Sequence, residues 1–225
     1  QRCFDRKHRI CRERGPWTAA ALRSTEHLPW QIRMGYRTRE VLSHLQFEID
    51  DLELLAGRIA PDWQPFADRE VAEAHRYLEG FPWPGGQTGH CELEYGRLFS
   101  VGIDGIRAEL ARRKESAPEG ASAVYESFSL ALEGLSTMAE HAGESAERAL
   151  MGASGDRRSE LEAIASSCRR VAHLPPESLR DAIQLIWFTI IGVMHGDHVG
   201  YIVPGHMDRT LLPFYRGDLE RGAET

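Results

Sequence analysis

The chain has 225 residues, of which 42% are hydrophobic and 27% are charged, and its formal net charge at pH 7 is -7. These proportions are ordinary for a water-soluble globular protein and are sufficient for one large domain. The acidic balance argues against a nucleic-acid partner, because binding to phosphates requires a basic surface.

Two further features bound the class of protein. The four cysteines, Cys3, Cys11, Cys91 and Cys168, contain no C-x-x-C pair, which argues against a zinc ribbon and against a secreted disulfide framework. The most apolar run, residues 186–194, is shorter than the roughly 20 residues of a membrane span. No signal peptide opens the chain, so we expect a cytoplasmic protein without a membrane partner.

Helical patterns dominate the first half of the chain after a basic, polar segment over residues 1–16. Apolar spacing predicts a helix within residues 38–54, followed by a turn at the acidic run. It also predicts a short helix over residues 68–78 with Asp68 as its N-cap. The Gly/Pro-rich stretch GFPWPGGQTG (80–89) indicates a loop of the kind that often positions functional groups. An amphipathic helix follows over residues 95–113, and then a linker over 114–119.

The second half is also predominantly helical. Residues 122–151 predict one long helix or two, with Phe128 among the inward-facing side chains, and residues 159–171 predict another. The pair Pro175–Pro176 breaks this pattern. A nearly all-apolar helix over residues 178–194 is expected to be buried on all sides. The segment VGYIV (199–203) is the best strand candidate, and residues 207–219 return to helix or turn.

The stretch HGDHVGYIVPGH (195–206) contains three histidines, His195, His198 and His206, together with Asp197. A metal site would need neutral imidazoles on one side of a rigid element, and this spacing matches no common zinc motif. Residues three apart on a strand also point to opposite faces. A metal site, a polar turn after a buried helix and a ligand pocket all stay open, and the last is favoured by a resemblance to a known family.

Four segments in chain order resemble the pyruvate formate-lyase domain of glycyl radical enzymes. HLPPESLRDAIQLIWF and PGHMDRTLLPFYRGDL are similar to that family's Pro-Pro, E-A-L-Q, W-F and G-R-x-D-Q-Y patterns. TGHCELEYGRLFSVGIDGI (88–106) is similar to its G-H-x-x-x-D-Y pattern, and IDDLELLAGRIAP (49–61) to its I-x-D-x-E-L-I-V-G pattern. The resemblance therefore covers the chain from about residue 25 to residue 219.

The chain departs from the family at several positions. His206 stands where the family has the arginine of G-R-x-D, Arg209 stands for its glutamine, and Glu94 for the aspartate of D-Y. These departures indicate either a divergent branch with its own substrate or a member whose pocket has been rebuilt. None of the cysteines lies in the family's G-C-x-E loop, so the thiyl cysteine and the radical glycine lie beyond residue 225 or the chain cannot perform the chemistry.

The resemblance implies an α/β fold in which residues 1–225 form the mostly helical N-terminal part of a pyruvate formate-lyase-like barrel domain, truncated at its C-terminus. It implies a dehydratase or lyase that cleaves a C–O, C–N or C–C bond of a small polar substrate in an oxygen-free cytoplasm. No cofactor is expected to bind directly. A glycyl radical is expected downstream, installed by an S-adenosylmethionine-dependent [4Fe-4S] activase, and the enzyme is expected to be a homodimer.

Radical elimination also needs a proton donor and an acceptor, and a histidine and a carboxylate supply that pair near neutral pH. His90 and Asp197 are the candidates, with Tyr201 and His198 as pocket-lining donors and Trp83 along the substrate channel. No metal ligand is assigned.

Simpler interpretations remain for these positions. His90 could cap the helix that starts near residue 95, Asp197 could be an ordinary helix-end residue, and Trp83 could serve packing alone. Two other functions also stay open: a non-catalytic binding module, and a metal-dependent hydrolase that uses His195, His198 and Asp197.

Overall fold

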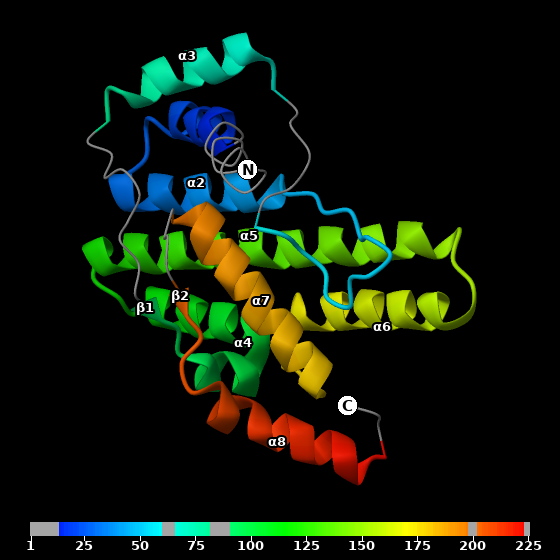
Figure 1. Ribbon diagram of the computed structural model, residues 1–225. Helices are drawn as coiled ribbons and strands as arrows, with labels where there is room; N and C mark the ends of the chain where they lie inside the picture. The colour runs from blue at the N-terminus through cyan, green and yellow to red at the C-terminus, as the bar shows by residue number, and fades with distance from the viewer. Residues whose placement is uncertain (1–13, 60–65, 82–90, 198–201, 223–225) are drawn as a thin grey trace.

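The computed structural model describes residues 14–59, 66–81, 91–197 and 202–222, and in these ranges it is predominantly helical (Figure 1). A first helical segment covers residues 14–24. The helices that come after it are α2 (Trp30–Ser43), α3 (Asp68–Leu78), α4 (Tyr95–Glu115), α5 (Glu119–Leu150), α6 (Gly155–Val171), α7 (Leu179–Gly196) and α8 (Met207–Glu220). Two short strands, β1 (Cys91–Glu92) and β2 (Ile202–Val203), pair in parallel.

The long helix α5 is the centre of the core. In Figure 1, α2 lies along one side of it, α4 and α6 lie along the other, and α7 crosses it. Met138, Ala142 and Ala146 follow each other at a spacing of four residues and are completely buried, as expected for the inner face of a helix. Gly35 allows α2 to approach α5 closely, because a Cβ atom at this position would lie 2.7 Å from the Cα atom of Ser127.

Helix α4 contains a kink at Gly102, whose backbone has φ 69° and ψ -179°. The kink lets the backbone NH of Asp104 donate to the carbonyl oxygen of His173 at 3.0 Å, in the connection between α6 and α7. Leu98 lies before the kink and Ile106 after it, and both side chains line one cavity between the helices. The kink therefore shapes the wall of that cavity.

Helix α7 confirms the prediction of a buried helix only in part. None of its residues is exposed, but Ile183, Trp187 and Ile190 are partly buried rather than fully buried. Ser178 caps its N-terminus by accepting a hydrogen bond from the NH of Asp181. The side-chain amide of Gln184 accepts a hydrogen bond from the NH of Ala56 at 2.8 Å and donates one to the carbonyl oxygen of Ala56 at 2.9 Å, which fixes the connection after α2 along α7. Among the described residues, no helix is both long and apolar enough to cross a membrane.

Helix α8 is attached to the rest of the fold through Asp218. This buried carboxylate accepts a hydrogen bond from the NH of Leu179 at 2.8 Å and also pairs with Arg221. Leu212, Tyr215 and Leu219 on the same helix are exposed. The predicted helix or turn over residues 207–219 is therefore a helix that lies on the outside of the bundle.

Several predicted boundaries were wrong. Helix α2 spans Trp30–Ser43 and does not extend to residue 54, because the next residues bury Leu45 and Phe47 from an irregular, non-helical segment. Arg58 then pairs with the acidic run through Asp50 and Glu53. The sequence did not reveal this loop, because Leu45 and Phe47 fit the apolar spacing of a helix. Apolar residues two positions apart can, however, also be buried by a non-helical segment.

Three local predictions also need correction. Asp68 is the first residue of α3, and the N-cap is Ala67, whose NH donates to the Glu70 carboxylate at 2.8 Å. Phe128 points outward and is 54% exposed. The predicted strand over residues 199–203 is described only at its last two residues. The predicted mostly helical character is confirmed for the described residues, and the α/β barrel stays a prediction.

Candidate functional site

The C-terminal end of α7 is fixed by groups from distant parts of the chain. The guanidinium of Arg14 donates to the carbonyl oxygen of Met194 at 2.8 Å. The Nε2 atom of His195 lies 2.9 Å from the carbonyl oxygen of Ile59 and therefore donates to it. Burial lowers the pKa of His195 to about 3, so this imidazole is neutral at physiological pH. His195 is thus an anchor inside the core, which argues against the metal-ligand role.

The next two residues are held by Arg37 of α2. Its guanidinium donates to the carbonyl oxygen of Gly196 and, at 3.0 Å, to the Oδ1 atom of Asp197. Arg37 is 4% exposed, and burial lowers its pKa to about 10, so it remains charged at neutral pH. A cation at this position satisfies the last carbonyl groups of α7 and is favoured by the negative end of the helix.

The two short strands bring together the segment that follows the G-H motif and the segment that follows HGDHVGY. Cys91 pairs with Ile202 and Glu92 with Val203, so the chain after the G-H motif runs beside the chain after HGDHVGY. Parallel strands of this kind connect segments that are far apart in sequence. The pair is short, with two residues in each strand.

Glu94 comes just after β1 and is the N-cap of α4. Its carboxylate oxygens accept hydrogen bonds from the NH groups of Gly96 at 2.8 Å and Arg97 at 3.0 Å. A carboxylate at a helix N-terminus stabilises the unpaired NH groups there. Glu94, which stands where the family has an aspartate, is thus a helix-capping residue, and both oxygens of its carboxylate accept hydrogen bonds from backbone NH groups.

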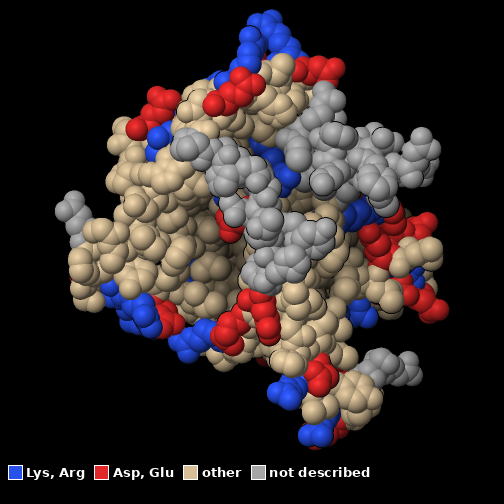
Figure 2. Space-filling model, turned by 60° about the vertical axis from the view of Figure 1, so that its left-hand side comes forward, with Lys and Arg blue, Asp and Glu red and all other residues tan. Residues whose placement is uncertain are grey.

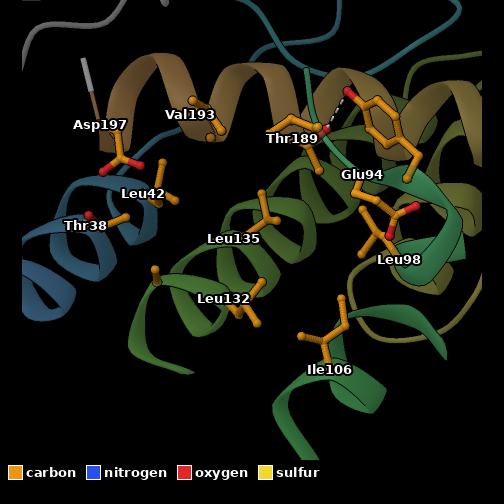
Figure 3. A pocket seen from close by; sticks show the side chains of 14 residues that line it. Thr38, Leu42, Glu94, Leu98, Ile106, Leu132, Leu135, Thr189, Val193 and Asp197 are labelled. Atoms are coloured by element: carbon orange, nitrogen blue, oxygen red, sulfur yellow. Dashed lines mark hydrogen bonds between the residues drawn. The ribbon is translucent and has the colours of Figure 1, made fainter. Parts of the chain in front are cut away.

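A cavity of about 260 Å³ lies between α2, α4, α5 and α7 (Figure 3). Its walls are mostly aliphatic, and its lining consists of Thr38, Leu42, Leu93, Glu94, Tyr95, Leu98, Ile106, Ala131, Leu132, Leu135, Thr189, Gly192, Val193 and Asp197. Asp197 and Thr38 lie together at one end, and Glu94 lies at the other (Figure 3). The hydroxyl of Thr189 is 3.4 Å from that of Tyr95, within hydrogen-bonding distance.

Of the predicted site residues, the structure places Asp197 on this cavity. Its side chain is 62% exposed. Trp83, His90, His198 and Tyr201 lie outside the described residues. Asp197 therefore shares one cavity with Leu93, Glu94 and Tyr95, which come closely after His90 in the chain.

The remaining candidates lie away from this cavity. His206 is exposed just before α8, and its side chain makes no capping hydrogen bond. The thiol of Cys168 is fully buried between helices, and burial raises its pKa to about 12. Within the described ranges, no group of three or more His, Cys, Asp or Glu side chains is arranged to hold a metal ion.

Sequence reasoning missed two residues of the site, Arg37 and Thr38. The only signal for Arg37 was a charged side chain on the apolar face of α2, since Val41 and Leu42 one turn later are buried. A buried charge requires a partner, but the partner of Arg37 lies 160 positions away in the sequence. The capping role of Glu94 could have been predicted from its position just before the helix at Tyr95.

Comparisons with known proteins agree with this architecture. Residues 65–225 match the family model described as pyruvate formate lyase-like. The chain is 32% identical over 139 residues to the probable dehydratase YbiW of Escherichia coli, and 30% identical over 151 residues to (2S)-3-sulfopropanediol dehydratase of Klebsiella oxytoca. These alignments cover 58% and 61% of the chain, but only 17% and 18% of the two relatives.

The fold is also found in solved structures. A structure concerned with 1,2-propanediol dehydration in Roseburia inulinivorans superposes with a TM-score of 0.83 at 22% identity. It covers 95% of this chain, whereas this chain covers 33% of it. The likeness shows the fold, and the chain spans about a third of that structure's length.

Proposed function

Because the chain belongs to the pyruvate formate lyase-like family of glycyl radical enzymes, we propose that it is the N-terminal part of a radical dehydratase or lyase. The bond cleaved is a C–O, C–N or C–C bond of a small polar substrate. The observation that carries this proposal is the family match over residues 65–225, which includes the α4, α5 and α7 walls of the cavity but not α2.

Asp197 is the proposed proton-transfer residue that the structure describes. Arg37 donates to its Oδ1 atom, and no described residue donates to its Oδ2 atom, which is therefore available to a substrate hydroxyl or amine. A carboxylate held in one orientation by a buried cation is suited to exchange a proton repeatedly at a single place. His90 is the proposed second member of the pair, and Trp83, His198 and Tyr201 are proposed to line the substrate site.

The radical itself is proposed to reside in a part of the protein outside residues 1–225. Cys168 is unsuited to be the thiyl residue, because its thiol is buried in the core and does not line the cavity. Residues 1–225 would then form the helical start of an α/β barrel domain. An S-adenosylmethionine-dependent [4Fe-4S] activase would install the glycyl radical, in a homodimeric enzyme of an oxygen-free cytoplasm.

The proposal is tested on the full-length gene product, activated without oxygen by its activase. We expect a glycyl radical signal in electron paramagnetic resonance and loss of substrate in a screen of diols, amino alcohols and hydroxylated sulfonates. Asp197→Asn should retain the radical signal and lower turnover by about 100-fold or more, the usual contribution of a proton-transfer residue. The exposed Asp51, which lies outside the cavity, provides the matched control Asp51→Asn, which should behave like wild type. Absence of any radical signal, or full turnover in Asp197→Asn, would contradict the proposal.

A further inference from the structure

The charges around the cavity are unevenly distributed. Its lining contains two carboxylates, those of Glu94 and Asp197, and no Lys, Arg or His among the described residues. Glu94 already accepts two backbone hydrogen bonds as the N-cap of α4. The Oδ1 atom of Asp197 is paired with Arg37, so in the part of the chain that the structure describes its Oδ2 atom is the lining carboxylate oxygen that remains available to a ligand.

The environment of Asp197 favours a cation over an anion. Asp197 comes directly after the last turn of α7, and the carbonyl groups at a helix C-terminus carry partial negative charge. Arg37 offsets part of this charge, but its side chain is buried, does not line the cavity and is bound to Gly196 and Asp197. An anionic ligand group at this end of the cavity would be repelled both by the carboxylate of Asp197 and by the negative end of α7.

The other walls determine the shape of the ligand. Leu42, Leu98, Ile106, Leu132 and Val193 present aliphatic surface, and the cavity volume of about 260 Å³ accommodates a compact apolar group. Figure 2 shows uncharged surface mainly on the left of that view, with acidic and basic side chains along its upper and lower margins and near the centre of the face. Burial of an apolar substituent against such walls is favourable, whereas a second charged group there would lose its hydration.

We infer that this cavity binds a small primary amine that carries an apolar substituent, with its ammonium group on Asp197. The inference rests on the proposed function in taking this cavity as the substrate site. It distinguishes the chain from the Klebsiella oxytoca relative, whose name specifies a sulfonated diol. The described part of the cavity lining offers no cation to a sulfonate or carboxylate.

Three probes that share a phenylethyl group and differ in charge test the inference on the unactivated protein by isothermal titration calorimetry. They are 2-phenylethylamine, 2-phenylethanol and 3-phenylpropanoate. We expect the amine to bind at least tenfold more tightly than the alcohol, and the carboxylate to bind most weakly. Asp197→Asn should reduce the affinity for the amine to that for the alcohol, and Asp51→Asn should leave all three affinities unchanged.

A second variant tests the location. Leu132→Trp places a large side chain in the cavity and should weaken the amine and the alcohol alike. Asp197 is largely exposed, so Asp197→Asn tests the charge independently of the stability of the tryptophan variant. Equal or tighter binding of the carboxylate, or an amine affinity that Asp197→Asn does not change, would overturn the inference. These binding measurements need no radical. The preference for the amine can therefore be absent while the radical signal is present, and the radical signal can be absent while the preference for the amine is present.

Discussion

The kink in α4 makes a quantitative prediction for Gly102→Ala. The backbone of Gly102, with φ 69° and ψ -179°, lies in a region that is essentially restricted to glycine. A Cβ atom at this position would lie 2.6 Å from the carbonyl oxygen of His173 and 2.7 Å from the nitrogen of Pro175. Both contacts are with backbone, so rotation of a side chain cannot relieve them.

The two costs can be added because they have different origins. Backbone strain contributes about 1–3 kcal/mol, and overpacking against a fixed neighbour contributes about 1–3 kcal/mol. The free energy of unfolding should therefore fall by roughly 2–6 kcal/mol. For a chain of this length the melting temperature should fall by about 2–4 °C for each kcal/mol. The measurement is urea and thermal unfolding followed by circular dichroism.

Two other glycines separate these costs. Gly155 has φ 56° but nothing within 4 Å of a Cβ atom, so Gly155→Ala should show backbone strain alone, about 1 kcal/mol. Gly120 lies near the start of α5 with open space around it, and Gly120→Ala should stabilise the protein by about 0.5–1 kcal/mol. If Gly102→Ala lowers the free energy of unfolding no more than Gly155→Ala does, the close contact with the α6–α7 connection contributes no measurable cost, and the reasoning is refuted.

Three further predictions concern titration and reactivity. Burial lowers the pKa of His173, but hydrogen bonds to Glu140 and Asp104 outweigh burial, so the pKa is raised overall. Protonated His173 therefore contributes to the free energy of unfolding. This contribution is complete below about pH 6.5 and is lost as pH rises through the pKa of the folded state. The stability difference between wild type and His173→Gln in urea should therefore narrow from pH 6 to pH 8, and a widening difference would contradict the reasoning. His195 is held neutral in the folded protein with a pKa of about 3, whereas in the unfolded chain it gains a proton below about pH 6.5. Wild type should therefore lose more stability than His195→Asn as pH falls from 6.5 toward 3. Urea unfolding measured at a series of acidic pH values checks this. Cys168 should resist N-ethylmaleimide in the native protein and react in urea, which mass spectrometry of peptides detects; rapid labelling of the native protein would be inconsistent with its burial.

The helices that could be predicted from the sequence are those whose pattern is local. Helix α4 begins at Tyr95, and α7 begins one residue after its cap at Ser178, because capping residues and apolar spacing act within a few positions. The start of α2 at Trp30 was missed, since Pro29 before it was the only local signal. Pro commonly stands at the start of a helix, but a proline alone does not distinguish a helix start from a turn.

The site was predicted less well, for a different physical reason. Asp197 could be proposed from the family resemblance, which implies a carboxylate for proton transfer, and the structure puts it on a cavity. Its partner Arg37 and the anchoring of His195 by Ile59 depend on contacts between segments more than 130 positions apart. Such contacts arise from the packing of whole helices, and no local pattern contains them.

The anchoring of α7 also has a consequence for how the chain folds during synthesis. Arg14 and Arg37 leave the ribosome long before Met194 and Asp197, which they bind across 180 and 160 positions. At about 5–20 residues per second, the basic N-terminal groups wait on the order of 10–40 s for these partners. Contacts of such long range are formed slowly, whereas the adjacent helices α5 and α6 can pack early. The cavity is therefore complete only after α7 has been synthesised, and mutations that weaken the N-terminal helices should lower the yield of folded protein.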